Sequence, residues 1–329
     1  MWKIINRRVC AGSFSMLMVA FTASAQTQTP DNTFIIGVVE QQLANPFFAK
    51  LQQAAIDEAK KNGLQTMAAA SSTAGDSDTQ IAAIENMINR GVKGIVIDPA
   101  NPYALRNVVK KARDAGIVII TTNTSLEPAT AADASYETDN FAAGELIGQW
   151  SKARLGQNAA KVAMLDYDLS DKTSKARHDG FLKGFGINDK SPEISGTALT
   201  QANVETGQSS MENLLSAHPD INVVYTINEP AAQGAALAVK RMKKEVLMTS
   251  IDGSCSGVRS VASGAIGATV MQFPERMGQL AVNAIITSVN GGAKPEGINN
   301  SGTVLITDSP VEGIDSKDSG WGLKHCWGE

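Results

Sequence analysis

Polar and aromatic side chains recur just behind the apolar runs of this sequence, where they could meet a ligand. The residues in these positions are Asn45, Phe47, Phe48, Asp98, Asn123, Thr124, Asp166, Asn228, Glu229, Asp252 and Gln272. Carboxylates and amides pair with hydroxyl groups, and aromatic faces cover apolar C–H surfaces. The set is therefore suited to a neutral ligand that is rich in hydroxyls.

A second pattern could support covalent catalysis. GSCSG at 253–257 places Cys255 between an apolar run and a helical pattern, as in a nucleophile elbow, and Asp308 or Asp315 and then His325 follow. Against this interpretation, Cys326 is available as a disulfide partner for Cys255, and no glycine cluster follows an early strand to form an oxyanion hole. An exported hydrolase with Cys255 as its nucleophile stays open as the weaker alternative.

The sequence lacks the common motifs for nucleotides and metals. It contains no GxxxxGK[ST], and residues 37–42, after the first apolar run, read GVVEQQ instead of GxGxxG. The histidines at 178, 218 and 325 are not spaced as metal ligands, and those at 178 and 218 lie in helical patterns as surface or structural residues. We expect no cofactor, no metal and no enzymatic activity.

The segment NPFF at 45–48 admits two interpretations. Asn45 before a proline is a favoured helix cap, and a capping side chain can also face a ligand. Helical spacing groups Phe48 with Leu51 and the alanines at 55 and 59 as a core stripe, which would leave Phe47 for a ligand. We expect both rings at the site, with Phe48 shared with the core.

Short apolar runs alternate with helical patterns along the chain. The expected strands are 34–40, 64–70, 94–99, 117–123, 161–168, 193–199, 221–228, 245–252 and 267–272. The expected helices are 45–63, 78–91, a segment ending at 116, 140–155, 171–185, 203–217, 229–241 and 274–292. Val- and Ile-rich runs without alternation are typical of parallel strands buried on both faces. Because this alternation of strands and helices begins again after residues 137–140, we predict two doubly wound α/β lobes.

The first residues indicate export. Lys3, Arg7 and Arg8 precede a short apolar run and then the small-x-small site Ala23-Ser24-Ala25, so we expect a signal peptide over 1–25. Its apolar run is shorter than the ~20 residues that a membrane span needs. The chain carries 29 Lys and Arg against 33 Asp and Glu, and cleavage makes it more acidic. This charge argues against nucleic acid as a partner.

Cleavage would leave two of the three cysteines, Cys255 and Cys326. Disulfides persist in oxidising compartments, so we favour a bond between them, which would hold the C-terminal tail on the body. Two separate buried thiols are the alternative.

Several segments of the chain are distinctive: NPFF, ETDN at 137–140, RHDGF at 177–181, SAHPD before INVVYTIN, and VMQFP at 270–274. Through these segments the chain, from about Phe34 to its end, resembles the type I periplasmic sugar-binding proteins of ABC importers, in the ribose-binding-like group. NEPAAQGA at 228–235, SIDGSCSG at 250–257 and the tail 313–328 are similar to fructose-binding members. Two residues depart from ribose-type members: Asn123-Thr124 stands where they have Asp-Arg, and Ala202 where they have an aromatic residue. Fructose-binding members tend to have Asp-Thr there, so Thr124 fits and Asn123 does not.

The resemblance implies a type I periplasmic binding protein fold with two lobes and three crossings, near Thr138, Gln272 and Thr303. The lobes would comprise 31–138 with 273–302, and 139–272 with 303–329. The implied ligand-binding residues are Asn45, Phe47, Phe48, Asn123, Thr124, Arg177, Asn228, Asp252 and Gln272. From the residues alone, Arg177 could instead pair with Asp179, Asp252 could cap the next helix, Asn123 could cap a turn, and Glu229 is expected to support its helix dipole.

The resemblance also implies the function. We expect the substrate-binding component of an ABC sugar importer: a periplasmic monomer that captures a monosaccharide, such as fructose or a related ketose or polyol, by hinge closure. It would deliver this sugar to permease subunits in the inner membrane. A receptor that presents sugar to a chemoreceptor or sensor kinase is a further alternative. A sugar-sensing repressor is not favoured, because a signal peptide occupies the place of a DNA-binding domain.

Overall fold

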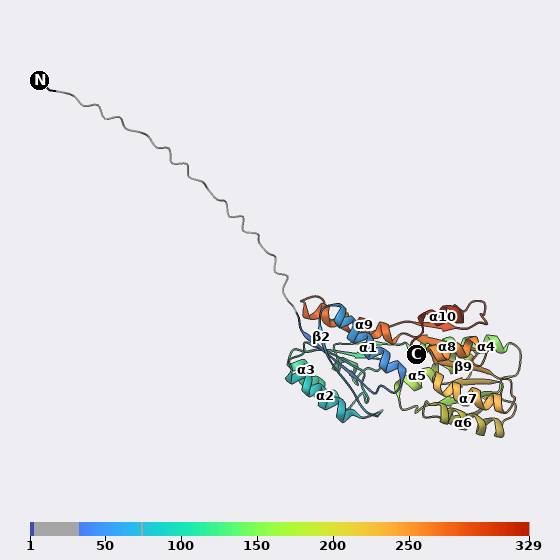
Figure 1. The fold of residues 1–329 in the computed structure, drawn as a ribbon. Coiled ribbons are helices and arrows are strands. Elements are labelled where there is room, and N and C mark those ends of the chain that lie inside the picture. Colours follow the sequence, from blue (N-terminus) through green and yellow to red (C-terminus); the bar gives the residue numbers. More distant parts are fainter. Residues whose placement is uncertain (3–32, 74, 329) are drawn as a thin grey trace. The chain divides into compact units, whose positions relative to one another are not determined.

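A computed structural model describes residues 1–2, 33–73 and 75–328 (Figure 1). The predicted signal peptide lies almost wholly outside these residues. The unit from Thr33 to Glu329 is described below by itself. In the described part of the chain, no helix combines the length and the apolar character that crossing a bilayer requires.

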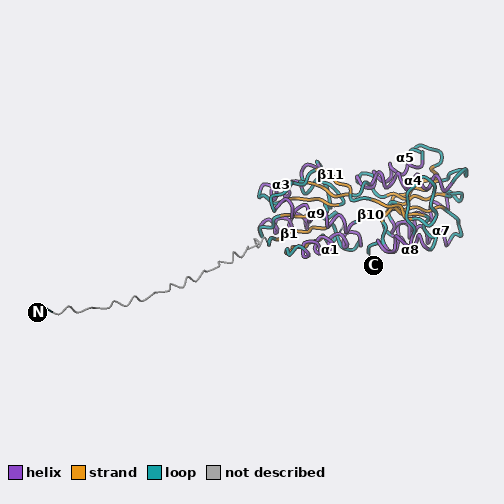
Figure 2. The backbone as a smooth tube through the Cα atoms, turned by 90° about the horizontal axis from the view of Figure 1, so that it is seen from above, coloured by secondary structure: helices purple, strands orange, loops and turns teal. Residues whose placement is uncertain are grey.

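Two six-stranded sheets organise this unit (Figure 2). The first has the order β11-β5-β4-β3-β1-β2 with all neighbours parallel. The second has the order β12-β10-β9-β8-β6-β7, and within it β12 runs antiparallel to β10. The strands are β1 (Ile35–Glu40), β2 (Gln65–Ala70), β3 (Gly94–Ile97), β4 (Val118–Thr122), β5 (Ala134–Glu137), β6 (Val162–Asp166), β7 (Ile194–Leu199), β8 (Val223–Thr226), β9 (Leu247–Asp252), β10 (Ala268–Gln272), β11 (Gly297–Asn300) and β12 (Thr303–Ile306). The prediction of two α/β lobes is confirmed.

Helices cover both faces of each sheet, which explains why the central strands are buried on both faces and rich in Val and Ile. In the first lobe α1 and α9 pack on one face and α2 and α3 on the other. In the second lobe α4 and α5 cover one face, and α6, α7 and α8 the other. The helices are α1 (Pro46–Lys61), α2 (Ser77–Asn89), α3 (Arg106–Asp114), α4 (Asn140–Leu155), α5 (Lys172–Phe185), α6 (Val204–Ala217), α7 (Glu229–Arg241), α8 (Cys255–Ala262), α9 (Pro274–Val289) and α10 (Ser319–His325), with a 3₁₀ turn at Ala129–Ala131.

The chain passes from one sheet to the other at three places. It leaves β5 for α4, leaves β10 for α9, and leaves β11 for β12. Two of these crossings are tied together, because Thr138 Oγ1 donates a hydrogen bond of 2.9 Å to Gln272 Oε1. The lobes are therefore connected by adjacent segments.

Helix caps lie directly behind the strands that lead into them. Asn45 accepts a hydrogen bond from the Phe47 N–H at 2.9 Å and begins α1. Asn228 accepts one from the Ala231 N–H at 3.1 Å and begins α7. Such caps satisfy N–H groups that have no partner within the helix. They also fix these amide side chains at the carboxyl ends of the sheets.

Glycines bring α4 and α5 unusually close. A Cβ atom on Gly144 would lie 2.1 Å from the Arg177 carbonyl oxygen, and one on Gly180 would lie 2.2 Å from the Phe141 carbonyl oxygen. This approach lets Asn140 Oδ1, in the first turn of α4, accept a 2.8 Å hydrogen bond from Arg177 Nε on α5. The glycines thus decide where the Arg177 guanidinium lies.

Every strand and helix range expected from the sequence is present, with ends shifted by a few residues. The sequence analysis did not identify β5, β11 and β12 as separate strands, nor the helix α10. β11 reads GINN, and it is held by pairing with β5 and not by burial of its own side chains. Such short polar strands carry no apolar pattern to read.

Candidate functional site

A cavity of about 190 Å³ lies at the carboxyl ends of strands from both sheets, and all nine of the predicted ligand-binding residues line it. The first lobe contributes Asn45, Phe47, Phe48, Asn123 and Thr124. The second lobe and the β10 crossing contribute Arg177, Asn228, Asp252 and Gln272. Residues separated by more than 200 positions therefore meet because the sheets present the same edge to one another.

The cavity is also lined by Ala202, which the sequence analysis noted only as a departure from ribose-type members, and by residues that it did not select: Gln41, Tyr167, Asp171, Thr173, Ser174 and Ile227. Gln41 and Tyr167 directly follow β1 and β6, so the rule that inspects the residue behind each strand could have found them. Asp171 and Ser174 belong to the cap of α5, where Ser174 N–H donates to Asp171 Oδ2 at 2.8 Å. The sequence pattern around these two residues indicates only that a helix starts there, and does not indicate contact with a ligand.

The prediction that Phe48, and not Phe47, is the ring shared with the core is wrong. Phe47, not Phe48, joins the core stripe: it is 5% exposed and packs with Leu51, Met277 and Trp327. Phe48 is half-buried and meets Phe47 edge-on, with ring centroids 5.5 Å apart. The reason is tertiary, because the tail residue Trp327 covers the Phe47 side of the helix. Both rings nevertheless line the cavity.

Asp252 is the centre of the polar network in the second lobe. Its Oδ1 accepts a hydrogen bond from Gln272 Nε2 at 2.9 Å and lies 3.6 Å from Arg177 NH1, while its Oδ2 accepts from the Glu229 N–H at 3.2 Å. Burial raises the pKa of Asp252, and the neighbouring guanidinium opposes this shift. The helix cap that Asp252 might have supplied is formed by Ser254 instead, which accepts from the Gly257 N–H.

Arg177 is buried and does not pair with Asp179, which binds Lys175 instead. Besides Asn140 and Asp252, its guanidinium donates to the Ile227 carbonyl at 3.0 Å. The planar guanidinium is thus held in one orientation at the cavity wall.

Asn123 lies in front of a buried carboxyl group. Its backbone has a φ of 60°, a conformation that asparagine tolerates better than most residues. Its Nδ2 lies 3.3 Å from Asp98 Oδ2, and Gln41 Nε2 donates to Asp98 Oδ1 at 3.1 Å. Asp98 is fully buried and does not line the cavity, and burial raises its pKa to about 8. Its contact with Asn123 therefore supports the site from behind.

Two further residues behind strand ends have supporting positions. Asp166 is buried and bonds to His178 Nδ1 at 3.0 Å. Glu229 is fully buried, and its carboxylate accepts hydrogen bonds from the Gly253 N–H at 2.8 Å and the Thr269 hydroxyl at 2.7 Å, and from Ser254. Glu229 lies in the first turn of α7, as expected, and does not line the cavity, and its carboxylate also binds donors of the loop before α8. Burial raises the pKa of Glu229 to about 7, and the charge of Asp252 adds to this shift.

A second cavity of about 440 Å³ has Asn123, Thr124 and Thr173 in common with the first. Glu137, Asn140 and other polar residues line it. Beside it, Lys172 of the second lobe forms an ion pair with Glu127 of the first. Apolar residues, among them Phe141 and Ile298, complete its lining, so this second cavity is of mixed character.

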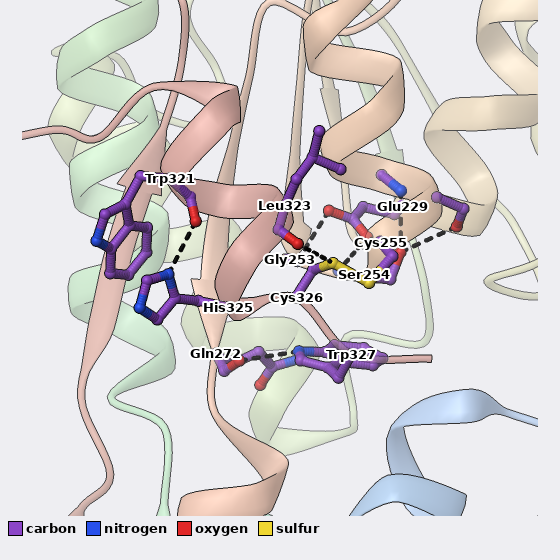
Figure 3. The surroundings of a disulfide bond; sticks show 12 residues. Glu229, Gly253, Ser254, Cys255, Gln272, Trp321, Leu323, His325, Cys326 and Trp327 are labelled. Carbon is purple, nitrogen blue, oxygen red and sulfur yellow. Dashed lines mark hydrogen bonds between the residues drawn. A yellow bond between two sulfur atoms is a disulfide. The ribbon is translucent and has the colours of Figure 1, made fainter. Parts of the chain in front are cut away.

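The hydrolase alternative finds no support around Cys255 (Figure 3). The structure pairs Cys255 with Cys326, with Cα atoms 4.8 Å apart, so the thiol is not presented to a substrate. His325 bonds through Nδ1 to the Trp321 carbonyl at 2.8 Å and stacks on the Trp321 ring. Neither residue lines the cavities described above.

Two α/β lobes, three crossings and a polar, aromatic-walled cavity at facing strand ends define a bilobed ligand-binding protein. The family model described as "Periplasmic binding protein domain" matches residues 36–293, and the chain belongs to this family.

Named relatives agree with this class. The chain is 30% identical to the ribose import binding protein of Bacillus subtilis over 258 residues, which cover 78% of this chain and 82% of that protein. It is 26% identical to the D-allose-binding periplasmic protein of Escherichia coli, over 86% of this chain and 91% of that one. A solved ABC transporter solute binding protein from Mycobacterium smegmatis, with bound glycerol, matches with a TM-score of 0.76 and 27% identity, covering 88% and 96% of the two chains.

Proposed function

We propose that this protein is the substrate-binding component of an ABC sugar importer. It captures a monosaccharide between its lobes, closes by bending at the three crossings, and delivers the sugar to a permease in the membrane. Relatives named for ribose and D-allose support this class of ligand. Their role as binding proteins supports a protein that is not an enzyme.

The observation that carries the proposal is the composition of the 190 Å³ cavity. Two phenylalanine rings of the first lobe are combined there with amides from both lobes, with the buried Arg177 guanidinium, and with the carboxylates of Asp171 and Asp252. Such a site can cover the C–H faces of a sugar ring while bonding its hydroxyls. Ligand contacts to both lobes would favour closure, because only the closed arrangement makes all of them.

Within the site, Asp252 and Gln272 would accept and donate hydrogen bonds to neighbouring hydroxyls, as would Asn228 on the same lobe. Asn45, Asn123 and Thr124 would bind the opposite edge of the sugar. We assign fructose or a related ketose or polyol as the ligand. Ala202 and the Asn123-Thr124 pair differ from the residues of ribose-binding proteins, and the segments around 228–235 and 250–257 resemble fructose-binding members.

The proposal extends to the mature protein. Cleavage after Ala25 would release it to the periplasm as a monomer, with lobes comprising 31–138 plus 273–302 and 139–272 plus 303–329. Cys255 and Cys326 would be oxidised there. An assay of free thiols in the denatured, unreduced mature protein tests this pairing: we expect none, and two would favour the hydrolase alternative.

A thermal shift screen tests the function. A ligand that binds only the folded protein raises the melting temperature by mass action. We expect D-fructose or another ketose or polyol in a panel with D-ribose, D-allose and myo-inositol to raise it in the micromolar to millimolar range. If no sugar or polyol in the panel does so, the proposed function is contradicted.

Asp252→Asn gives the matched mutational test. Losing a charged hydrogen-bond partner in a buried site costs ~2–3 kcal/mol, roughly a 30- to 150-fold increase in the sugar Kd. Asp252→Ala should abolish the shift without unfolding the protein. Glu245→Gln makes the same acid-to-amide change on an exposed side chain and should leave the Kd unaltered.

A further inference from the structure

The last residues of the described chain connect the two lobes outside the three crossings. We call residues 326–328 the tail strap. Its anchor is in the second lobe, where Cys326 pairs with Cys255 at the start of α8. The Cys255 N–H also donates to the Trp327 carbonyl at 2.9 Å. A backbone hydrogen bond and the cysteine pair thus both attach the tail strap to the start of α8 (Figure 3).

The other end of the tail strap lies on the first lobe. The Trp327 side chain is 6% exposed and forms one apolar cluster with Phe47, Leu51 and Met277 from the starts of α1 and α9. Its ring meets Phe47 edge-on, with centroids 5.4 Å apart and planes at 74°, a favoured aromatic geometry. Gly328 then passes so close to Pro46 that a Cβ atom would lie 2.6 Å from the proline Cβ, at a φ of 76°.

Trp327 also contacts the crossing at β10. Its Nε1–H donates a 3.0 Å hydrogen bond to the Gln272 carbonyl oxygen (Figure 3). The Gln272 side chain joins Thr138 of the β5 crossing to Asp252 of the cavity wall, as described above. Trp327 does not line the cavity, yet it touches Phe47 and Gln272, and both of these residues do.

We propose that Trp327 is a positioning residue for ligand binding: held by the Cys255–Cys326 pair, it fixes the Phe47 wall and the Gln272 crossing from behind. This inference rests on the proposed function. The ring is buried against the first lobe while its main chain is fixed to the second, so the lobes cannot separate at this point without exposing apolar surface. An added dithiol such as dithiothreitol reduces the Cys255–Cys326 disulfide to two thiols with two electrons and two protons, and is itself oxidised to a cyclic disulfide. This reduction removes one of the two anchors and lets the ring leave Phe47. Sugar affinity then depends on the redox state of the pair, and Trp327 transmits that dependence.

Calorimetry with D-fructose, or with the sugar giving the largest shift in the screen, tests the coupling. Losing an aromatic contact that orients a binding residue should weaken affinity roughly 3- to 10-fold. We expect this loss in three cases: on reduction of the wild type, in the Cys255→Ser/Cys326→Ser double variant, and in Trp327→Ala. Because all three break one connection, reduction of Trp327→Ala should add less than roughly twofold. Additive losses, or a Trp327→Ala variant that binds as the wild type does, would overturn the proposal.

Two substitutions separate the parts of the mechanism. Trp327→Phe keeps an aromatic ring against Phe47 and removes the donor to Gln272, so it should lose less affinity than Trp327→Ala. Trp321→Ala is the matched control, since Trp321 belongs to the same tail and stacks on His325 but lies outside the Phe47 cluster. It should retain wild-type affinity and its full response to reduction. Loss of that response in Trp321→Ala would assign the effect to general loosening of the tail.

A measurement without ligand keeps the inference testable if no sugar binds. Hydrogen exchange of the first amides of α1 reports directly on the helix turn that carries Phe47. We expect faster exchange there on reduction and in Trp327→Ala, with α3 as the unaffected internal reference. Unchanged exchange would overturn the positioning role whatever the ligand. Faster exchange together with no sugar binding would contradict only the proposed function.

Discussion

The Asn123 side-chain nitrogen lies 3.3 Å from Asp98 Oδ2, so a carboxyl group one strand away stands behind an amide at the cavity wall. Gln41 donates to the other oxygen of the same carboxyl group. Glu40 is adjacent and fully buried, and its two carboxyl oxygens have no hydrogen-bond partner among the described residues. Burial, and then the charge of Asp98, raises the pKa of Glu40. Acidic groups are thus concentrated behind the ligand side chains of the first lobe.

Asp98→Asn should make the stability less dependent on pH. The pKa of Asp98 in the folded protein is about 8, against an ordinary 3.8, so the folded state holds a proton that the unfolded chain releases in this interval. The free energy of unfolding of the wild type therefore falls as the pH rises through that interval. We compare the free energy of unfolding of Asp98→Asn with that of the wild type at each pH. We expect this difference to shift by ~1–3 kcal/mol in favour of the variant between pH 5 and pH 8.

Urea unfolding at a series of pH values measures this difference. Glu245→Gln, an exposed acid-to-amide change, is the control and should follow the wild-type curve. The groups that also act on Asp98 are Glu40 on β1, Glu137 on β5 and Asp171 at the start of α5, and all remain in the variant. Parallel curves for Asp98→Asn and the wild type would show that Asp98 is ionised in the folded protein throughout.

The two phenylalanines should respond differently to truncation. Phe47→Ala removes a buried ring from the cluster with Leu51 and Trp327 and should cost ~3 kcal/mol or more of unfolding free energy. Phe48→Ala removes a half-buried ring and should cost less than half as much. Both should weaken sugar binding. Denaturant unfolding compared with calorimetry separates the effects, and a larger stability loss for Phe48→Ala would contradict the packing described.

The same pair shows how far the sequence can predict this site. Residues such as Asn228 and Gln272 could be selected because strand ends are easily located by apolar runs, and parallel strands end at a common edge. The assignment of Phe47 could not be made, because its covering residue lies in the tail, 280 positions away. Helical spacing alone grouped Phe48 with Leu51, since it contains no information about which side a distant ring will cover.

The supporting position of other residues, behind the cavity and not in its lining, could not be predicted for a different reason. Asp98 and Glu229 were noticed as polar groups behind strands, but burial separates them from the cavity, and burial depends on the packing of neighbouring loops. The strands β5, β11 and β12 were missed because each is only four residues long, and β11 in addition has no apolar pattern. Periodicity therefore predicts the layers of this fold well. Contacts between residues far apart in the sequence, such as Phe47 and Trp327, cannot be predicted from it.

The free energy of unfolding should fall as the pH rises into the alkaline range, because His178 then loses its proton. Burial lowers the pKa of His178, but hydrogen bonds and charges from Asp166 and Asp189 outweigh this effect and raise it to about 9 from an ordinary 6.5. The folded protein thus holds this proton more tightly than the unfolded chain does. The resulting stabilisation is fully present below about pH 6.5 and is lost as the pH rises through about 9.

His178→Gln tests this assignment. We expect the variant to be ~1–3 kcal/mol less stable than the wild type at pH 6, with the gap narrowing by pH 9. His218→Gln, on an exposed side chain at the end of α6, should show no such convergence. Urea unfolding between these pH values gives the comparison, and a gap that stays constant would mean that His178 contributes through packing alone.

Gly144→Ala should damage stability and sugar binding together. The added Cβ atom would lie 2.1 Å from the Arg177 carbonyl oxygen, which is backbone and cannot move without shifting α5 against α4. Overpacking of this kind costs ~1–3 kcal/mol. The shift would also lengthen the hydrogen bond from Arg177 to Asn140 and turn the guanidinium away from Asp252, so the sugar Kd should rise as well. Gly320→Ala in α10, whose added Cβ would meet only the Asp318 side chain, at 3.4 Å from Oδ1, is the control and should alter neither quantity. A Gly144→Ala variant that loses stability but binds sugar as the wild type does would show that the close approach of α4 and α5 does not position Arg177 for binding.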